Sequence, residues 1–177
     1  MRAPRKKLLI VDGYNVINSW RKGMDARTLA DAREELAHKL MDYAGYTGQK
    51  VVLVFDAWMS DRTSRTTEET GPLTVVFTQK GETADHYIER LCDSYAKEVE
   101  YDRLEIDVAT SDNVEQVVVL SRGARRVSSR ELLREMESVR TQGTEAVKQQ
   151  VVRKKSTVMD SLPEDIRMKL DKMRRGQ

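Results

Sequence analysis

Four short apolar runs, each followed by a carboxylate, constrain this fold more than any other feature of the sequence. The runs have the length of buried strands and lie at residues 8–11, 51–55, 73–77 and 106–109. Segments with helical spacing separate them, and strands that alternate with helices form parallel sheets through right-handed crossovers. We therefore predict an α/β protein, a three-layer α/β/α sandwich with a mostly parallel sheet.

The expected elements alternate along the chain. Strands are expected at residues 7–11, 50–55, 73–78, 104–109 and, as a short fifth strand, 125–127. Helices are expected at residues 28–46, 83–101, 115–120 and from Ser128 or Ser129 onward. Gly13 and Asn15 predict a tight turn after the first strand, and the polar stretch 57–72 predicts a long loop.

The carboxylates occupy equivalent positions after the strands. Asp12, Asp56 and Asp112 follow the first, second and fourth strands, whereas Glu82 and Asp85 open the helix after the third. Because functional sites of open α/β sheets gather at the carboxyl ends of the strands, these acids should converge. Crowded carboxylates repel one another unless a cation lies among them, and oxygen ligands suit Mg²⁺ or Mn²⁺. The pattern predicts a metal-dependent phosphoryl-transfer enzyme.

Each acid also has a simpler interpretation when it is taken alone. Asp favours turns and helix caps, so a single acid after a strand is more often structural than catalytic. Four acids in the same topological position favour the shared site. Asp56 is the weakest member, because Asp56-Ala57-Trp58 also fits a plain loop.

Several residues beside the acids are candidate substrate contacts. Asn15 either hydrogen-bonds Asp12 or a phosphate oxygen, or only supports the turn, and Ser111 either binds phosphate or caps a helix. Tyr14 offers a stacking surface next to Asp12. Arg65 could grip a phosphate through its guanidinium fork, or could simply be a solvated loop arginine. A denser basic patch is predicted at Arg122, Arg125 and Arg126.

Composition argues against several other classes of protein. The single cysteine, Cys92, excludes an internal disulfide framework and a Cys-rich zinc site, and two histidines make a His-based site a poor hypothesis. No apolar run approaches the ~20 residues that span a bilayer, so we expect a cytoplasmic protein without a membrane partner. No Gly-x-Gly-x-x-Gly follows the first strand, which argues against a nucleotide cofactor.

Charge is distributed unevenly along the chain. Residues 121–177 carry 15 Lys and Arg against 8 Asp and Glu, whereas residues 1–120 carry 16 against 21. A basic segment behind an acidic one favours a polyanionic partner, with nucleic acid the leading candidate, although a solvated charged tail is the alternative. We predict an α/β domain over residues 1–142 and a basic helical C-terminal extension over 143–177, with a capping box at 161–164.

Four motifs together resemble the NYN domain, and most closely its bacterial YacP-like branch of the PIN-like nucleases. They are Asp12-Gly13-Tyr14-Asn15-Val16-Ile17, Phe55-Asp56-Ala57, Gly81-Glu82-Thr83-Ala84-Asp85 and Thr110-Ser111-Asp112-Asn113-Val114-Glu115-Gln116. The resemblance covers about residues 7–139. It implies a PIN-like sandwich and a Mg²⁺- or Mn²⁺-dependent endoribonuclease. It also implies a bacterial, ribosome-associated enzyme that cuts mRNA during translation.

In this hypothesis Asp12, Asp85 and Asp112 hold the metal, and Glu82 is a further ligand or a base that acts through water. Asn15 and Asp56 are their neighbours. One alternative is a non-catalytic RNA- or ribosome-binding module that keeps a PIN-like shell. A less favoured alternative is a phosphatase of the haloacid-dehalogenase type, which would need a second Asp at position 14, where this chain has Tyr.

Overall fold

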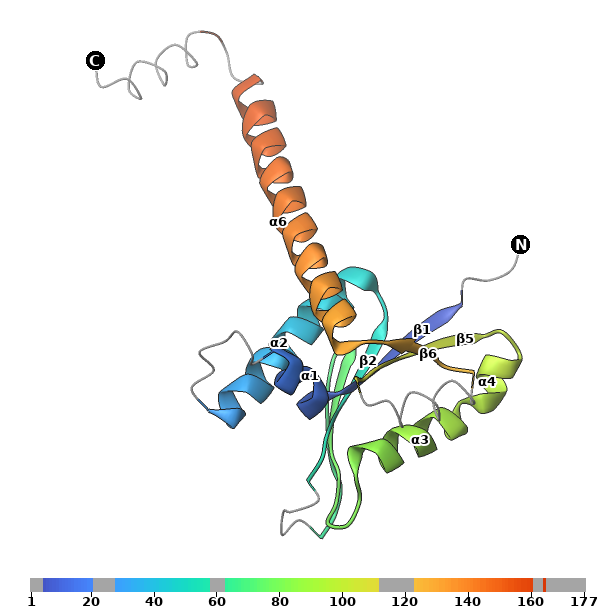
Figure 1. Ribbon diagram of the computed structural model, residues 1–177. Helices are drawn as coiled ribbons and strands as arrows, with labels where there is room; N and C mark the ends of the chain where they lie inside the picture. Colours follow the sequence, from blue (N-terminus) through green and yellow to red (C-terminus); the bar gives the residue numbers. More distant parts are fainter. Residues whose placement is uncertain (1–4, 21–27, 58–62, 112–122, 161–163, 165–177) are drawn as a thin grey trace. The chain divides into compact units, whose positions relative to one another are not determined.

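The structure is a computed structural model that describes residues 5–20, 28–57, 63–111, 123–160 and 164 (Figure 1). The predicted helix at 115–120, the capping box at 161–164 and the site residues Asp112 and Arg122 lie partly or wholly outside these residues. The chain forms two compact units, Met1–Val139 and Arg140–Gln177. The first unit holds the sheet, and most of the second is helical where it is described.

The described strands of the first unit form a six-stranded sheet in the order β3-β4-β2-β1-β5-β6. Every neighbouring pair is parallel except the antiparallel pair of β3 and β4. The strands are β1 (Lys6–Asp12), β2 (Lys50–Phe55), β3 (Thr66–Thr70), β4 (Leu73–Phe77), β5 (Leu104–Ala109) and β6 (Arg125–Val127). The predicted mostly parallel sheet is confirmed, with β1 and β2 at its centre.

Helices cover both faces of the sheet (Figure 1). One face packs against α1 (Gly13–Trp20), α2 (Leu29–Thr47) and the first turns of α6 (Ser129–Asp160), around buried residues such as Leu36, Leu53 and Leu132. The other face packs against α3 (Ala84–Ser94) and α4 (Ala96–Glu100), around residues such as Ile10, Ile88 and Ile106. These three layers confirm the predicted α/β/α sandwich.

The helices begin at the capping residues that their sequences supply. The Thr28 hydroxyl accepts a hydrogen bond from the Asp31 N–H at the start of α2, and Thr83 accepts one from His86 N–H at the start of α3. Ser128 and Glu131 form a reciprocal capping box before α6. These caps fix where α3 and α6 begin relative to the strand ends.

Three local predictions were wrong. Asp12 leads directly into α1 instead of a tight turn, because Val16 and Ile17 are buried one helical turn later. The polar stretch 57–72 contains β3, an exposed edge strand that joins β4 through Gly71, whose φ of 55° suits a two-residue hairpin. The helix predicted at 83–101 is divided at Tyr95 into α3 and α4.

The predicted boundary at 142/143 falls inside α6, which is continuous from Ser129 to Asp160. The division into domains 1–142 and 143–177 stays a prediction. None of the helices in the described part of the chain is both long and apolar enough to cross a membrane.

Candidate functional site

The carboxyl edge of the sheet brings several predicted site residues together. Asp12 is the last residue of β1 and pairs with Val54, two residues before Asp56 on the neighbouring strand β2. On its other side, Val11 pairs with Ala109, which leads into Thr110 and Ser111. The loops after three adjacent strands therefore surround Asp12.

Asn15 connects these loops through its backbone and its side chain. Its N–H donates to Asp12 Oδ1 over 3.1 Å. Its Oδ1 accepts from the Ser111 N–H over 2.8 Å and from the Ser129 hydroxyl over 2.9 Å. Ser129 in turn donates its N–H to Ser111 Oγ over 3.3 Å. Asn15 thus holds the Asp12 carboxylate and ties the end of β1 to the end of β5 and the start of α6.

Asp56 is joined to the start of α3. The Ala84 N–H donates to Asp56 Oδ2 over 3.4 Å, so the carboxylate lies at the positive end of that helix. The segment after β2 is held by Thr78, whose hydroxyl accepts a hydrogen bond from the Ala57 N–H over 2.9 Å. Asp85, exposed in the first turn of α3, is brought to the same edge of the sheet by this connection.

Glu82 is buried between two arginines. Its side chain is 6% exposed, and Arg65 makes a two-bond fork to it, from Nε over 3.2 Å and from Nη2 over 2.5 Å. Arg90 also forms an ion pair with Glu82. The Arg65 guanidinium lies 4.7 Å from the centre of the Tyr87 ring, whose burial raises the pKa of its hydroxyl. Glu82 therefore fixes the position and orientation of Arg65.

Tyr14 packs toward the core at this edge. Its partly buried ring lies 5.2 Å from the ring of Phe55, which in turn stacks 5.3 Å from Phe77. A Cβ atom at Gly13 would overlap the Phe55 ring, so only glycine fits between Asp12 and Tyr14. The local Asp-Gly-Tyr-Asn sequence is thereby explained by packing as well as by chemistry.

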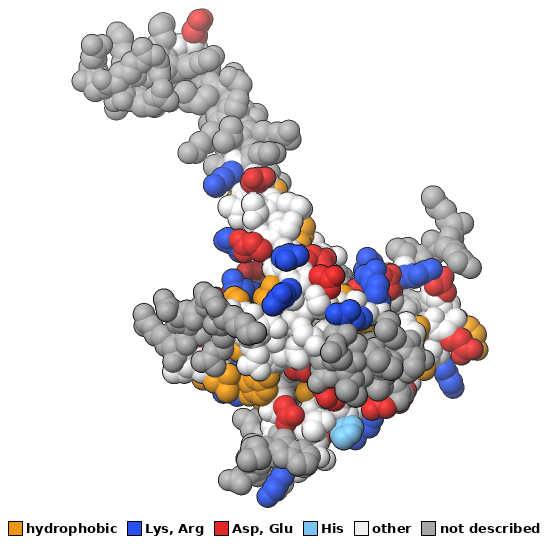
Figure 2. All heavy atoms as spheres, viewed as in Figure 1, with side chains coloured by type: hydrophobic (Ala, Val, Ile, Leu, Met, Phe, Trp, Pro, Cys, Tyr) orange, Lys and Arg blue, Asp and Glu red, His pale blue; other side chains and the backbone are white. Residues whose placement is uncertain are grey.

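Two arginines of the predicted basic patch, Arg125 and Arg126, are exposed on β6. Arg125 donates two hydrogen bonds to Asp107, from Nε over 2.7 Å and from Nη2 over 2.8 Å. Its Nη2 also forms an ion pair with Glu105 over 3.3 Å. These acids raise the pKa of Arg125 and offset its charge locally. On the face shown in Figure 2, basic and acidic side chains are also interspersed along α6. Arg126 is therefore a better candidate than Arg125 for contact with an anionic ligand.

The donor chemistry of the site fits a hard divalent cation. The carboxylates at this edge offer oxygen ligands. Cys92 is buried on the inner face of α3, and His86 lies exposed in the first turn of the same helix, next to Asp85. Within the described residues, no group of three His, Cys, Asp or Glu side chains could hold a metal ion. The centre of three carboxylates that the sequence predicts would include Asp112, which lies outside the described residues.

Sequence reasoning missed two buried polar residues that build the site. Thr78 and Ser129 are both fully buried, at 0% exposure. Thr78 directly follows β4. The acids Asp12, Asp56 and Asp112 are candidates because each follows a strand, and the same criterion could have found Thr78. Ser129 carries no such signal, because its partner Asn15 lies 114 residues away.

Comparison with known proteins agrees with this architecture. The family model of the YacP-like NYN domain matches residues 9–175. The uncharacterized protein YacP of Bacillus subtilis (strain 168) is 36% identical over 171 residues, which cover 96% of this chain and 97% of that protein.

Two crystal structures of Rae1 (YacP) from Bacillus subtilis have the same fold. One of them, a mutant in which a tryptophan is replaced by leucine, superimposes with a TM-score of 0.68 at 33% identity, covering 93% of this chain and 98% of the mutant. A second structure gives a TM-score of 0.66 at 34% identity, covering 96% and 95%. This chain therefore belongs to the YacP-like NYN family, whose domains are of the nuclease type.

Proposed function

We propose that this chain is a metal-dependent endoribonuclease that hydrolyses phosphodiester bonds of mRNA on or near the ribosome, in a bacterial cytoplasm. The observation that carries the proposal is the edge at which Asp12 is held by Asn15 while Asp56 holds the start of α3 with Asp85. Membership of a nuclease-type family supports the same chemistry.

We propose Asp12, Asp85 and Asp112 as the residues that would hold Mg²⁺ or Mn²⁺. The cation would supply charge stabilisation at the phosphate and a more acidic water. The contribution of the chain is to keep oxygen donors oriented before the substrate arrives. Asn15 does this for Asp12 with a backbone N–H, which donates a hydrogen bond to Asp12 Oδ1.

Glu82 fits best as a positioning residue for Arg65. Both of its carboxylate oxygens accept hydrogen bonds from Arg65, and Arg90 adds a second cation. This arrangement supports a role in orientation more than the predicted role as ligand or base. Arg65, fixed in this way beside the acidic edge, could then present its outer N–H groups to a backbone phosphate.

The remaining candidates take supporting roles in the proposal. Ser111 follows the end of β5, Tyr14 lies in the first turn of α1 and Arg126 lies on the edge strand β6. In the proposal they would contact the RNA backbone or a base. The basic residues beyond 142 would contact the ribosome, which the family resemblance and the charge distribution support.

The test is cleavage of an mRNA in a reconstituted translation reaction and as naked RNA, with Mg²⁺ or Mn²⁺ and with an EDTA control. Wild type is compared with Asp85→Asn and with Asp93→Asn, a matched change at an exposed position on the same helix. Discrete cuts that need the metal and Asp85, and that survive Asp93→Asn, support the proposal. RNA or ribosome binding without any cut would favour the non-catalytic binding module.

A further inference from the structure

A large basic groove lies at the amino edge of the sheet, opposite the acids. Its volume is roughly 1220 Å³, and it is lined by the first residues of β1, β2 and β5 and by the ends of α2 and α4. That volume exceeds the ~300–1,000 Å³ of a typical small-molecule pocket. The strand β1 of seven residues separates the two edges, a distance of about 20 Å at the usual rise per residue.

The groove carries an excess of positive charge. Its lining includes five cationic side chains and two acidic ones, Glu98 and Asp102. Asp102 forms an ion pair with Arg5 over 2.7 Å. Within the part of the chain that is described, Lys6 and Lys50 form no ion pair, and both are exposed. Uncompensated ammonium groups in a concave surface attract a polyanion.

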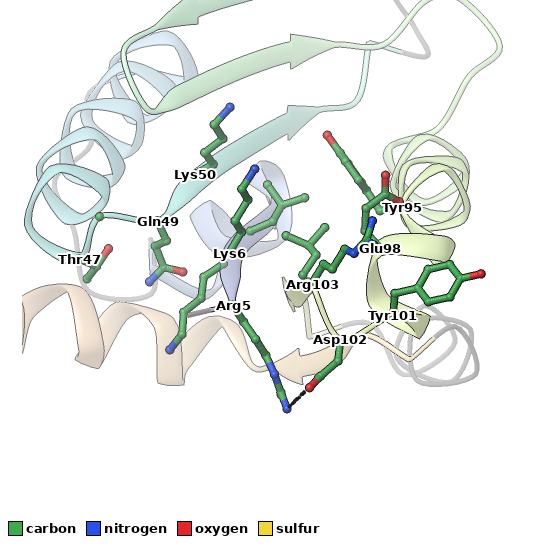
Figure 3. A pocket seen from close by; sticks show the side chains of 14 residues that line it. Arg5, Lys6, Thr47, Gln49, Lys50, Tyr95, Glu98, Tyr101, Asp102 and Arg103 are labelled. Carbon is green, nitrogen blue, oxygen red and sulfur yellow. Dashed lines mark hydrogen bonds and ion pairs between the residues drawn. The ribbon is translucent and has the colours of Figure 1, made fainter. Parts of the chain in front are cut away.

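The positions of these cations follow from the parallel register. Lys50 pairs with Leu8 of the neighbouring strand β1. Lys6 lies two residues before Leu8, so the side chains of Lys6 and Lys50 point to the same face of the sheet. Figure 3 shows the Lys6 and Lys50 side chains extending in similar directions, with Arg5 turned toward Asp102. The charges are therefore spread along the groove, as a chain of phosphates requires, instead of meeting at one point.

An exposed aromatic residue borders the groove. Tyr101 is 66% exposed, and the Arg103 guanidinium lies 5.4 Å from its ring centre. The turn that presents both residues contains Asp102 with a φ of 58°, a conformation that few residues other than glycine adopt. The Arg103 N–H closes this turn on the Glu98 carbonyl over 2.9 Å. A flat exposed ring beside a cationic groove is the arrangement that binds unpaired bases.

We propose that this amino-edge groove binds single-stranded RNA, with Lys6 and Lys50 on the phosphates and Tyr101 against a base. This site is separate from the acidic edge and goes beyond the proposed nuclease activity, because binding here needs neither metal nor cleavage. It would hold a stretch of RNA away from the point of cutting.

The experiment measures binding of fluorescein-labelled oligo(U) of about 12 nucleotides by anisotropy, in EDTA, across a salt series. The variants are Lys6→Gln and Lys50→Gln. The matched control is Lys39→Gln, which removes the same charge from α2, where Lys39 pairs with Glu35 outside the groove. Circular dichroism checks that each variant is folded.

Each phosphate contact on a single strand contributes ~0.7 to the slope of the logarithm of the binding constant against the logarithm of the salt concentration. Each groove variant should therefore weaken binding about fivefold at 0.1 M salt relative to Lys39→Gln. The slope should fall by the same ~0.7. Tyr101→Ala should weaken binding about fivefold or more through lost stacking. Asp102→Asn keeps a residue that tolerates the backbone conformation, removes the charge beside Arg5, and should tighten binding.

Binding by Lys6→Gln and Lys50→Gln within twofold of the control would overturn the proposal. Equal binding of a polyglutamate of matched charge would overturn its assignment to RNA. The two proposals fail separately. If no metal-dependent cuts are seen but Lys6→Gln and Lys50→Gln weaken RNA binding, only the nuclease proposal is overturned. If the RNA is cut but neither lysine variant weakens binding, only the groove proposal is overturned.

Discussion

Replacing Asn15 with Ala should destabilise the fold and disturb the site together. The substitution removes the acceptor of the Ser129 hydroxyl, which is fully buried, and of the more exposed Ser111 N–H. An unsatisfied buried hydroxyl costs ~1–3 kcal/mol, and a hydrogen bond that water can replace costs ~0.5–1.5 kcal/mol. The free energy of unfolding should therefore fall by roughly 2–4 kcal/mol.

Urea denaturation followed by circular dichroism measures this change, and a double-mutant cycle tests its cause. Ser129→Ala removes the buried hydroxyl itself, so Asn15→Ala should cost ~1–3 kcal/mol less in that background. If the two losses add within ~0.5 kcal/mol, the hydrogen bond does not hold these segments together and the reasoning is refuted.

Two further predictions concern packing and pH. Gly13→Ala should cost ~1–3 kcal/mol of unfolding free energy through overlap with the Phe55 ring, whereas Gly45→Ala, in open space on α2, should be neutral or stabilising; urea denaturation compares them. Burial and the hydrogen bond to Glu135 raise the pKa of Tyr43 above its value in the unfolded chain. The neutral hydroxyl is thus favoured by folding, and stability should be lost as pH rises above ~10. Tyr43→Phe should flatten that loss in denaturation curves recorded from neutral to alkaline pH.

Much of the architecture could be predicted because its causes are local in the sequence. The strands follow from apolar runs. The helices α2 and α3 begin directly after Thr28 and Thr83, the predicted helix starts, whose hydroxyls accept capping hydrogen bonds. The strand β3 could not be predicted in this way. Its residues are largely exposed at the edge of the sheet, so no buried face leaves a pattern, and its pairing with β4 decides its conformation.

In the candidate site, too, some features could be predicted from local sequence and others depend on contacts between distant residues. The placement of Asp12 and Asp56 at the ends of parallel strands follows from the alternation of apolar runs with helices. The strand order that makes β1 and β2 neighbours comes from the structure. The pairing of Glu82 with Arg65 and Arg90 does not, because it depends on how β3 and α3 come together in space. The contact of Asn15 with Ser129 likewise joins residues 114 positions apart, beyond any local signal.

The most direct test of the central claim is the rate of mRNA cleavage during translation by Asp85→Asn relative to Asp93→Asn. We predict discrete metal-dependent cuts at an unchanged rate for Asp93→Asn and a loss of at least ~100-fold for Asp85→Asn, the scale on which catalytic charge stabilisation is lost. Both variants should unfold at the wild-type urea concentration. Equal cleavage by the two folded variants, or cuts that persist in EDTA, would contradict the account.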